Sequence, residues 1–453
     1  MKRMGTFVLL LSALLFAQPR TLWIKNISEG SLMYHGTYWV EQTRDRGYII
    51  AGACSYLYPC IQKRDSLGEF MWLSVYDSLG GFETAARCIR QTEDGNYIVV
   101  ACVEAVWTYV DIHLIRIDSL GNVLWSKVYG GEEWDMPGTF QITEDGGYII
   151  VGETSSFGKG GYDVYVIKTD SLGDTLWTRT YGGLEDDVGR WIEATEDKGY
   201  IIVGSTKSYG RGKADVYLIK IDSLGNVLWE KTYGGEDEDE GRVVHSTCEG
   251  GYIIIGITSS FEEERCGYLI KIDSVGNVLW EKTYECLALS GEELGRNGYI
   301  IGGYITYGTT SYPYLLRVDT LGNVIWDKKY SDTVGSFIRC VHRTHDGGYI
   351  ILTHDYLIKT APDETGIGEE RHVGLTGFSV LEDRIRYEVR RNGRVIIEMY
   401  DATGRRVKKL LDEYQKAGRY EIKIEREGIP SGLYFIILKT PEGGYKGRVV
   451  IIE

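Results

Sequence analysis

Hydrophobic and polar positions follow one pattern that recurs about every fifty residues along most of this chain. Each unit has a run of alternating polarity, a glycine-containing turn, and then two runs that are apolar at nearly every position. In the unit that ends at Tyr233, the pattern predicts strands over residues 189–195, 200–204, 216–221 and 227–233. Two tight turns and one longer loop connect these strands, so we expect one antiparallel four-stranded sheet per unit.

Two aromatic series mark the repeat. A tryptophan lies in the last predicted strand of each unit, and a tyrosine opens the second strand. The tryptophans are Trp23, Trp72, Trp125, Trp177, Trp229, Trp280 and Trp326. The tyrosines are Tyr48, Tyr97, Tyr148, Tyr200, Tyr252, Tyr299 and Tyr349. Seven four-stranded units of this length predict an all-β fold, a seven-bladed β-propeller.

The central strands and the chain ends support this fold class. Residues 200–204 read YIIVG, which is apolar on both faces, as a sheet packed between two neighbours requires. The last repeat stops after a third strand at residues 356–360, whereas residues 21–27 form a fourth-strand sequence without a partner. We therefore expect the N-terminal strand to complete the last blade and close the ring.

The order of turns assigns the two faces of the propeller. Because successive strands alternate in direction, both tight turns of a unit fall on one face. The longer connections fall on the other, which we call the long-loop face. Loops on a rigid scaffold commonly carry function, so we expect ligand binding there.

The N-terminus predicts export. Lys2 and Arg3 precede an uncharged apolar stretch that ends near Ala17, which is typical of a secretory signal peptide over residues 1–17. No later stretch approaches about 20 apolar residues, so we expect no membrane span after signal removal. Residues 18–362 are then the propeller, 363–373 a polar linker and 374–453 a second domain. The expected location is secreted or on the cell surface.

Net charge and cysteine spacing limit the ligands and metals that this chain is expected to bind. The formal net charge is -15, and residues 363–453 are nearly balanced, so the repeat region holds the negative charge. This argues against binding nucleic acid. The chain has 8 cysteines without zinc-site spacing. The pairs Cys54 with Cys60 and Cys88 with Cys102 are the candidate disulfides.

Candidate ligand-binding residues lie near the long-loop face. Acidic side chains cluster in its loops and include Asp187 and Asp239. Arginines occupy one register position, five residues before the turn threonine of their units: Arg87, Arg190, Arg242 and Arg339. If the arginines pair with the acids, they neutralise part of the cluster. If they point into the central channel, they suit a carboxylate or sulfate. Calcium binding by the acidic loops stays open, and no other cofactor is expected.

Motifs for catalysis are not evident. The 7 histidines show no HExxH spacing, and there is no GxSxG. The repeated turn from Asp222 to Asn226 lacks the alternating oxygen ligands of an EF-hand, so we interpret it as a structural turn. We therefore expect no enzyme activity.

Two resemblances refine this interpretation. Tyr217 to Lys231, YLIKIDSLGNVLWEK, resembles the PQQ-like propeller repeat, and Thr143 to Gly183 is similar to repeats of exported bacterial and archaeal propellers of mostly unassigned function. This resemblance implies fold and not the quinone cofactor. The segments 399–408, 417–420 and 428–435 resemble the type A C-terminal sorting domain of type IX secretion, which implies an immunoglobulin-like β-sandwich recognised by the secretion machinery.

These observations favour a secreted or surface binding protein whose propeller recognises an extracellular glycan or protein. One alternative is a secreted hydrolase or lyase acting on polysaccharide, which requires carboxylates with histidine or tyrosine at the channel mouth. Another is a structural surface protein, which requires self-association without a small ligand.

Overall fold

The computed structural model describes residues 18–27, 36–54, 58–76, 85–104, 109–262, 264–333, 336–363, 378–381, 384–389, 391–401, 405–424, 432–440 and 443–451. The predicted signal peptide, 1–17, and all of the predicted linker except Asp363 lie outside these residues. The chain divides into two compact units, residues 1–367 and 368–453. Among the described residues, no helix is long and apolar enough to cross a membrane.

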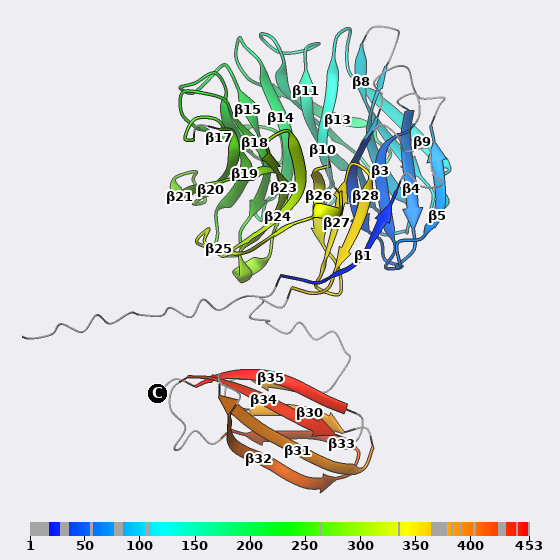
Figure 1. Ribbon diagram of the computed structural model, residues 1–453. Helices are drawn as coiled ribbons and strands as arrows, with labels where there is room; N and C mark the ends of the chain where they lie inside the picture. Colours follow the sequence, from blue (N-terminus) through cyan, green and yellow to red (C-terminus); the bar gives the residue numbers. More distant parts are fainter. Residues whose placement is uncertain are drawn as a thin grey trace, which may run out of the picture. The chain divides into compact units, whose positions relative to one another are not determined.

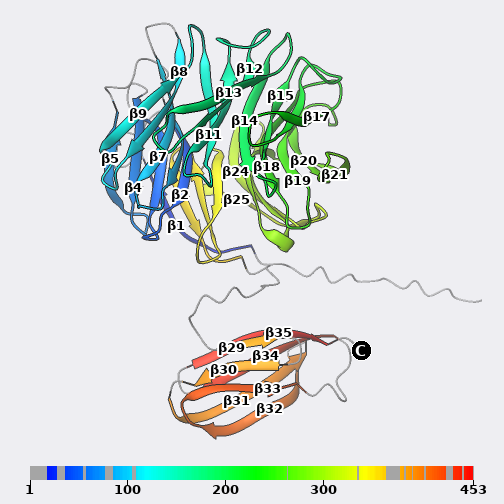
Figure 2. The ribbon, with the colours of Figure 1, turned by 180° about the vertical axis from the view of Figure 1, so that it is seen from behind.

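The first unit is built from four-stranded antiparallel sheets, an arrangement consistent with a β-propeller (Figure 1, Figure 2). Its described residues form seven such sheets, which we number along the chain. They are sheet 1 (β2 Gly36–Gln42, β3 Tyr48–Cys54, β4 Tyr58–Arg64, β5 Phe70–Val75), sheet 2 (β6 Ala85–Gln91, β7 Tyr97–Glu104, β8 Val110–Ile117, β9 Val123–Tyr129), sheet 3 (β10 Asp135–Ile142, β11 Tyr148–Thr154, β12 Asp163–Thr169, β13 Thr175–Tyr181), sheet 4 (β14 Asp187–Ala194, β15 Tyr200–Thr206, β16 Asp215–Ile221, β17 Val227–Tyr233), sheet 5 (β18 Asp239–Ser246, β19 Tyr252–Thr258, β20 Cys266–Ile272, β21 Val278–Tyr284), sheet 6 (β22 Leu287–Glu293, β23 Tyr299–Tyr307, β24 Thr310–Val318, β25 Val324–Lys329) and sheet 7 (β26 Ile338–Arg343, β27 Tyr349–Thr353, β28 Tyr356–Thr360, β1 Thr21–Asn26). In the described part of the chain, the short 3-10 helices η3 Gly295–Asn297 and η4 Ser331–Thr333 lie in the connections around sheet 6.

The N-terminal strand completes sheet 7, as the sequence predicts. β1 pairs antiparallel with β28, and Ile24 lies opposite Ile358. Figure 1 shows the blue β1 beside the yellow β28. The first strand of each sheet, which we call its inner strand, contacts the inner strand of the next sheet, and β26 contacts β2. The inner strands therefore form a closed ring around a central axis, and we call the region along this axis the channel.

The strands follow the hydrophobic pattern. β17 covers the predicted residues 227–233, and β14, β15 and β16 overlap the other three predicted strands of that unit. All seven residues of β11 and of β12 are buried, because both faces of a central strand pack against neighbouring sheets.

The tryptophan series holds neighbouring sheets together. Trp229 of sheet 4 packs its ring 6.3 Å from that of Tyr252 in sheet 5. Equivalent pairs form at four further interfaces: Trp23 with Tyr48, Trp125 with Tyr148, Trp280 with Tyr299 and Trp326 with Tyr349. The two aromatic series of the repeat thus meet across sheet boundaries, where each buries a large ring.

The described residues of the second unit form two sheets. They have the orders β29–β30–β33 and β32–β31–β34–β35. Their strands are β29 Phe378–Leu381, β30 Arg384–Val389, β31 Gly393–Asp401, β32 Arg406–Gln415, β33 Gly418–Lys423, β34 Gly432–Thr440 and β35 Gly443–Ile451. Ile385 and Tyr387 of one sheet share a buried core with Val395, Ile397 and Ile436 of the other. The unit is therefore a two-layer β structure with its own core.

One of the two candidate disulfides is present. Cys54 and Cys60 are bonded between the end of β3 and the start of β4. Cys88 and Cys102 are buried and are not bonded to each other. The two cysteines are not opposite each other on the paired strands: Cys88 lies opposite Val100, and Cys102 lies opposite Ala85.

Candidate functional site at the channel mouth

Every inner strand has an irregular register near its start. The irregularity falls at Tyr38, Arg87, Arg190, Arg242, Leu289 and Arg339 in six strands, and at Gly138 and Thr139 in β10. Inner strands begin at the long-loop face, so these residues lie near that end of the channel. A β-bulge redirects a side chain. The four predicted arginines all occupy this position, and we call them the arginine ring.

Two arginines of the ring lie against the aromatic side chains of Tyr38 and Phe337. The guanidinium carbon of Arg87 lies 4.4 Å from the centre of the Tyr38 ring. Arg339 lies 5.5 Å from the centre of the same ring and 4.3 Å from that of Phe337. These contacts join sheets 1, 2 and 7 at the channel mouth.

Two glutamates pair with the other arginines. Arg242 lies 2.5 Å from Glu240, and Arg265 of the β19–β20 loop binds the second oxygen of that carboxylate at 2.5 Å. Arg190 lies 3.9 Å from Glu153 of β11, at the limit of an ion pair. Among the described residues of this site, the arginine ring and Arg265 supply five guanidinium groups, whereas Glu153 and Glu240 supply two carboxylates, which leaves a local positive charge in an acidic chain.

Two tryptophans close the channel beneath the arginine ring. Trp39 and Trp191 follow Tyr38 and Arg190 directly, and their ring centres lie 5.6 Å apart. Because their strands belong to sheets 1 and 4, which are not neighbours, the contact must cross the channel. The two residues are 5% and 7% exposed. The indoles therefore form an apolar floor.

Several donors at this site are unsatisfied. The Nε atoms of Arg87, Arg242 and Arg339 are buried and have no hydrogen-bond partner among the described residues. The indole nitrogens of Trp39 and Trp191 are also without a described partner. Unsatisfied buried donors cost free energy, so a site rich in them favours an acceptor such as an anion.

The charges at the mouth influence one another. Burial lowers the pKa of Arg242, and the guanidinium groups of Arg190, Arg265 and Arg339 lower it further, against the opposing effect of Glu240. Burial would raise the pKa of Glu240, but Arg242, Arg265 and Arg190 outweigh it and hold that pKa low. Like charges around one axis repel, and a bound anion would relieve that repulsion.

A second charged layer lies below the tryptophans. His245 contacts Glu193 at 2.6 Å through Nδ1 and the Gly291 carbonyl at 3.0 Å through Nε2, so both nitrogens face acceptors. Arg90 lies 3.5 Å from Glu41. Because these charges are already paired, this layer offers a ligand less than the arginine ring does.

The two predicted aspartates have other hydrogen-bond partners. Asp187 is fully buried and accepts hydrogen bonds from the Gly183 amide at 2.7 Å and the Ser208 hydroxyl at 2.6 Å. Asp239 does the same with Gly235 and Ser260. Their carboxylates fix the long loops. Among the described residues, no group of three or more His, Cys, Asp or Glu side chains could hold a metal ion.

Sequence reasoning missed part of the site. Tyr38 shares the register of the four arginines, and Trp39 and Trp191 share the next position, so the repeat alignment contained this signal. Glu153 and Arg265 lie on other strands and loops, and only the fold places them at the channel mouth. Among other acids near the long-loop face, Glu240 pairs with the arginine ring, whereas Asp186 pairs with Lys207 and Asp237 with Lys213.

Comparisons with known proteins give distant structural likenesses. No family model matches, and no curated protein matches. Among solved structures, the chain is similar to PorZ, described as a surface component of the type IX secretion system of Porphyromonas gingivalis, with 13% identity, a TM-score of 0.47 and 92% of this chain covered. The match spans 60% of that protein's chain. Drosophila Semaphorin 2a matches with 8% identity and a TM-score of 0.48, over 96% of this chain and 98% of its own. At these values the likeness says nothing about ligand or activity.

Proposed function

We propose that this chain is an exported recognition protein that binds a carboxylate- or sulfate-bearing extracellular ligand, glycan or protein, at the channel mouth. The arginine ring over the Trp39–Trp191 floor supports the proposal. Arginine presents several donors in a fixed plane and suits carboxylate and sulfate oxygens. The side chains of Arg190 and Arg242 are 40% and 30% exposed, so a ligand entering from the long-loop face can reach them.

A matched pair of glycans tests this function. The probes are oligogalacturonate and its methyl ester, which have the same sugar backbone and differ in charge. We expect residues 18–453 to bind the acid more tightly than the ester, as measured by isothermal titration calorimetry. Substituting Arg190→Leu or Arg242→Leu should weaken acid binding about ten-fold, because each removes a charge-assisted hydrogen bond. Leucine suits this position, since Leu289 occupies it in sheet 6.

The control removes the same charge elsewhere. Arg405 is 84% exposed in the second unit, and Arg405→Leu should leave binding of the acid unchanged. Equal affinity for acid and ester, or equal loss in Arg405→Leu and Arg242→Leu, would contradict a site at the arginine ring.

The remaining architecture is part of the same proposal. Residues 18–362 form a seven-bladed propeller closed by β1, after a signal peptide at 1–17 and before a linker at 363–373. Residues 374–453 form an immunoglobulin-like domain that engages the secretion machinery. Deleting residues 374–453 should prevent surface delivery in the native host, measured by cell fractionation. Normal delivery of the truncated protein would refute the sorting role.

A further inference from the structure

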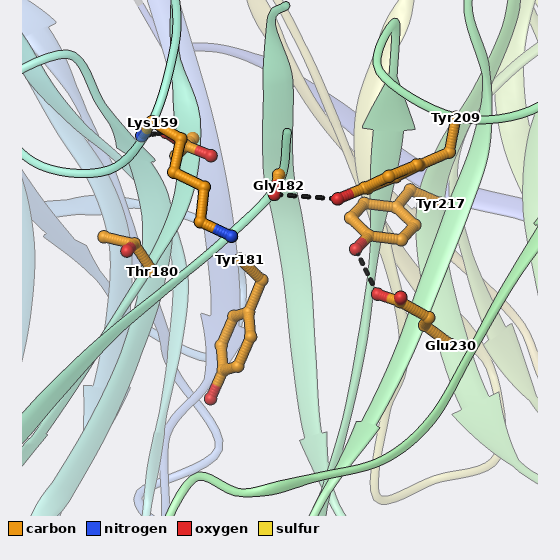
Figure 3. A pocket seen from close by; sticks show the side chains of 8 residues that line it. Lys159, Thr180, Tyr181, Gly182, Tyr209, Tyr217 and Glu230 are labelled. Carbon is orange, nitrogen blue, oxygen red and sulfur yellow. Dashed lines mark hydrogen bonds between the residues drawn. The ribbon is translucent and has the colours of Figure 1, made fainter. Parts of the chain in front are cut away.

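Sheets 3 and 4 form a pocket on the long-loop face, at their outer strands. The pocket has a volume of about 210 Å³. Sheet 3 contributes Lys159 and Thr180, and sheet 4 contributes Tyr209, Tyr217 and Glu230 (Figure 3). Its walls come from the β11–β12 and β15–β16 loops and from β13, β16 and β17. It is therefore distinct from the arginine ring, which lies on the inner strands.

The two tyrosines form one wall of the pocket. Tyr209 is 41% exposed, and its ring lies 5.7 Å from that of the buried Tyr217. The Tyr209 hydroxyl donates to the Gly182 carbonyl at 2.8 Å, which fixes the ring across the boundary between the sheets. The Tyr217 hydroxyl donates to Glu230 at 2.5 Å. Burial and Glu230 both raise the pKa of Tyr217, so this hydroxyl stays a donor.

A basic side chain and an acidic side chain face the space beside this wall. Figure 3 shows the Lys159 ammonium group on one side of the pocket and the Glu230 carboxylate on the other. The pocket also includes the Thr180 hydroxyl. Among described residues, neither Lys159 nor Glu230 forms an ion pair. The pocket thus combines an exposed aromatic face with a strong donor and a strong acceptor.

A similar residue set recurs at the boundary between sheets 4 and 5, with Phe261 in the position of Tyr209. Phe261 packs against Tyr268 with 5.3 Å between ring centres, and the Tyr268 hydroxyl bonds to Glu281. The register is the same, because Glu230 lies opposite Ile219 and Glu281 opposite Ile270. Arg211 and Thr232 stand in the positions of Lys159 and Thr180. Sheet 3 instead has Thr178, opposite Ile167, where sheets 4 and 5 have glutamate.

We propose that the pocket between sheets 3 and 4 binds one pyranose ring of a neutral glycan, and that the equivalent residues between sheets 4 and 5 bind a second one. The apolar face of a pyranose stacks on the exposed aromatic ring, Tyr209 or Phe261. Its hydroxyl groups both donate and accept, so they use the basic side chain and the glutamate together. A ligand with one hydroxyl or one charge would use only one of these groups. This site is independent of the anion site at the arginine ring.

Neutral methyl glycosides test the proposal. The probes are the methyl glycosides of glucose, galactose, mannose and N-acetylglucosamine, titrated into residues 18–453 and followed by saturation-transfer NMR and calorimetry. We expect at least one to bind saturably with two sites per chain. Glu230→Thr and Glu281→Thr should each remove one site, and the double variant should bind about ten-fold or more weakly. Threonine is compatible with the fold, since Thr178 occupies this position.

Two further variants separate binding from folding. Tyr209→Leu should remove the site between sheets 3 and 4, because the stacking ring is lost, while circular dichroism should show that the chain still folds. Glu196→Gln, in the exposed tight turn of sheet 4 on the opposite face, should bind like the parent chain. The proposal is overturned if no methyl glycoside saturates, if the double variant binds like the parent, or if short peptides occupy the pocket and glycosides do not.

Discussion

At the residue scale, some buried charges of the repeat are paired and others are not. Lys168, whose side chain is 6% exposed, binds Asp145 at 2.8 Å and also donates to the Thr169 carbonyl. Asp111 and Asp135, in contrast, each have a buried carboxylate oxygen without a hydrogen-bond partner among the described residues. A Cβ placed on Gly130 would lie 1.9 Å from Asp111 and 2.8 Å from Asp135, so two buried carboxylates flank one glycine. Burial and Asp135 raise the pKa of Asp111 to about 6.

This pair predicts a pH-dependent cost. A carboxyl whose pKa rises from 3.8 to about 6 on folding binds its proton more tightly in the folded chain. Stability therefore falls as pH rises through that window and stays lower above it. Asp111→Asn should remove the cost and stabilise the protein by about 1 to 3 kcal/mol at pH 8, with no gain at pH 4. Thermal melts at the two pH values measure the difference.

The repeat indicates that the substitution is compatible with the fold. At the boundary between sheets 5 and 6, the positions of the aspartate pair are occupied by Cys266 and Cys286, which are uncharged and buried. If Asp111→Asn instead lowers stability at pH 8, the ionised carboxylate of Asp111 stabilises the fold. That result would contradict a repulsion between Asp111 and Asp135.

At the element scale, the Asp-x-x-Gly turn both reverses the chain and contacts the preceding sheet. In the turn of sheet 4, Asp222 accepts hydrogen bonds from the amides of Leu224 and Asn226. Gly225 has φ +81° and approaches Trp177 of sheet 3. Its carbonyl accepts a hydrogen bond from Tyr181 at 2.7 Å. The turn therefore needs glycine for its backbone angle and for its close packing.

Alanine substitutions separate these two requirements. A Cβ on Gly225 would lie 2.8 Å from Arg179 and 3.0 Å from the Trp177 ring. Gly95 has a similar φ of +84° and nothing within 4 Å of the added atom. Gly95→Ala should cost about 1 kcal/mol and Gly225→Ala about 2 to 4 kcal/mol, measured by denaturant unfolding. Equal losses would show that the contact with Trp177 contributes nothing.

At the scale of the whole molecule, the ring of sheets depends on β1. Without β1, β28 would be an unpaired edge, and Trp23 would be lost from its contact with Tyr48 across the boundary with sheet 1. Deleting residues 18–27 should lower the Tm by about 10 °C or more and favour aggregation. Differential scanning calorimetry and light scattering measure both effects.

Adding the missing strand back provides the control. A synthetic peptide of residues 18–27 should restore part of the lost Tm by pairing with β28. An unchanged Tm after the deletion would mean that sheet 7 is stable with three strands and that the ring does not need this closure.

Sequence periodicity by itself determined the elements. Tyr200 and its equivalents mark central strands that are buried on both faces. These strands could be predicted because the pattern of apolar and polar side chains along a strand is set by residues close together in the sequence. The unpaired strand sequence at residues 21–27 also predicted its partner, because the last repeat lacked a strand. The shared position of the four arginines could be recognised for the same reason, because each lies five residues before the turn threonine of its unit.

Only the tertiary structure decided which of these residues meet. Glu153 and Arg265 lie beside the arginine ring because the closed arrangement of the sheets brings separate sheets to one axis. Trp39 meets Trp191 across that axis. Asp187 was predicted with the arginines, but it is hydrogen-bonded within its loops, because a side chain's partner depends on the backbone amides around it. A linear pattern encodes which face a residue occupies. It does not encode which distant residue shares that face, since that contact exists only after the sheets close into a ring.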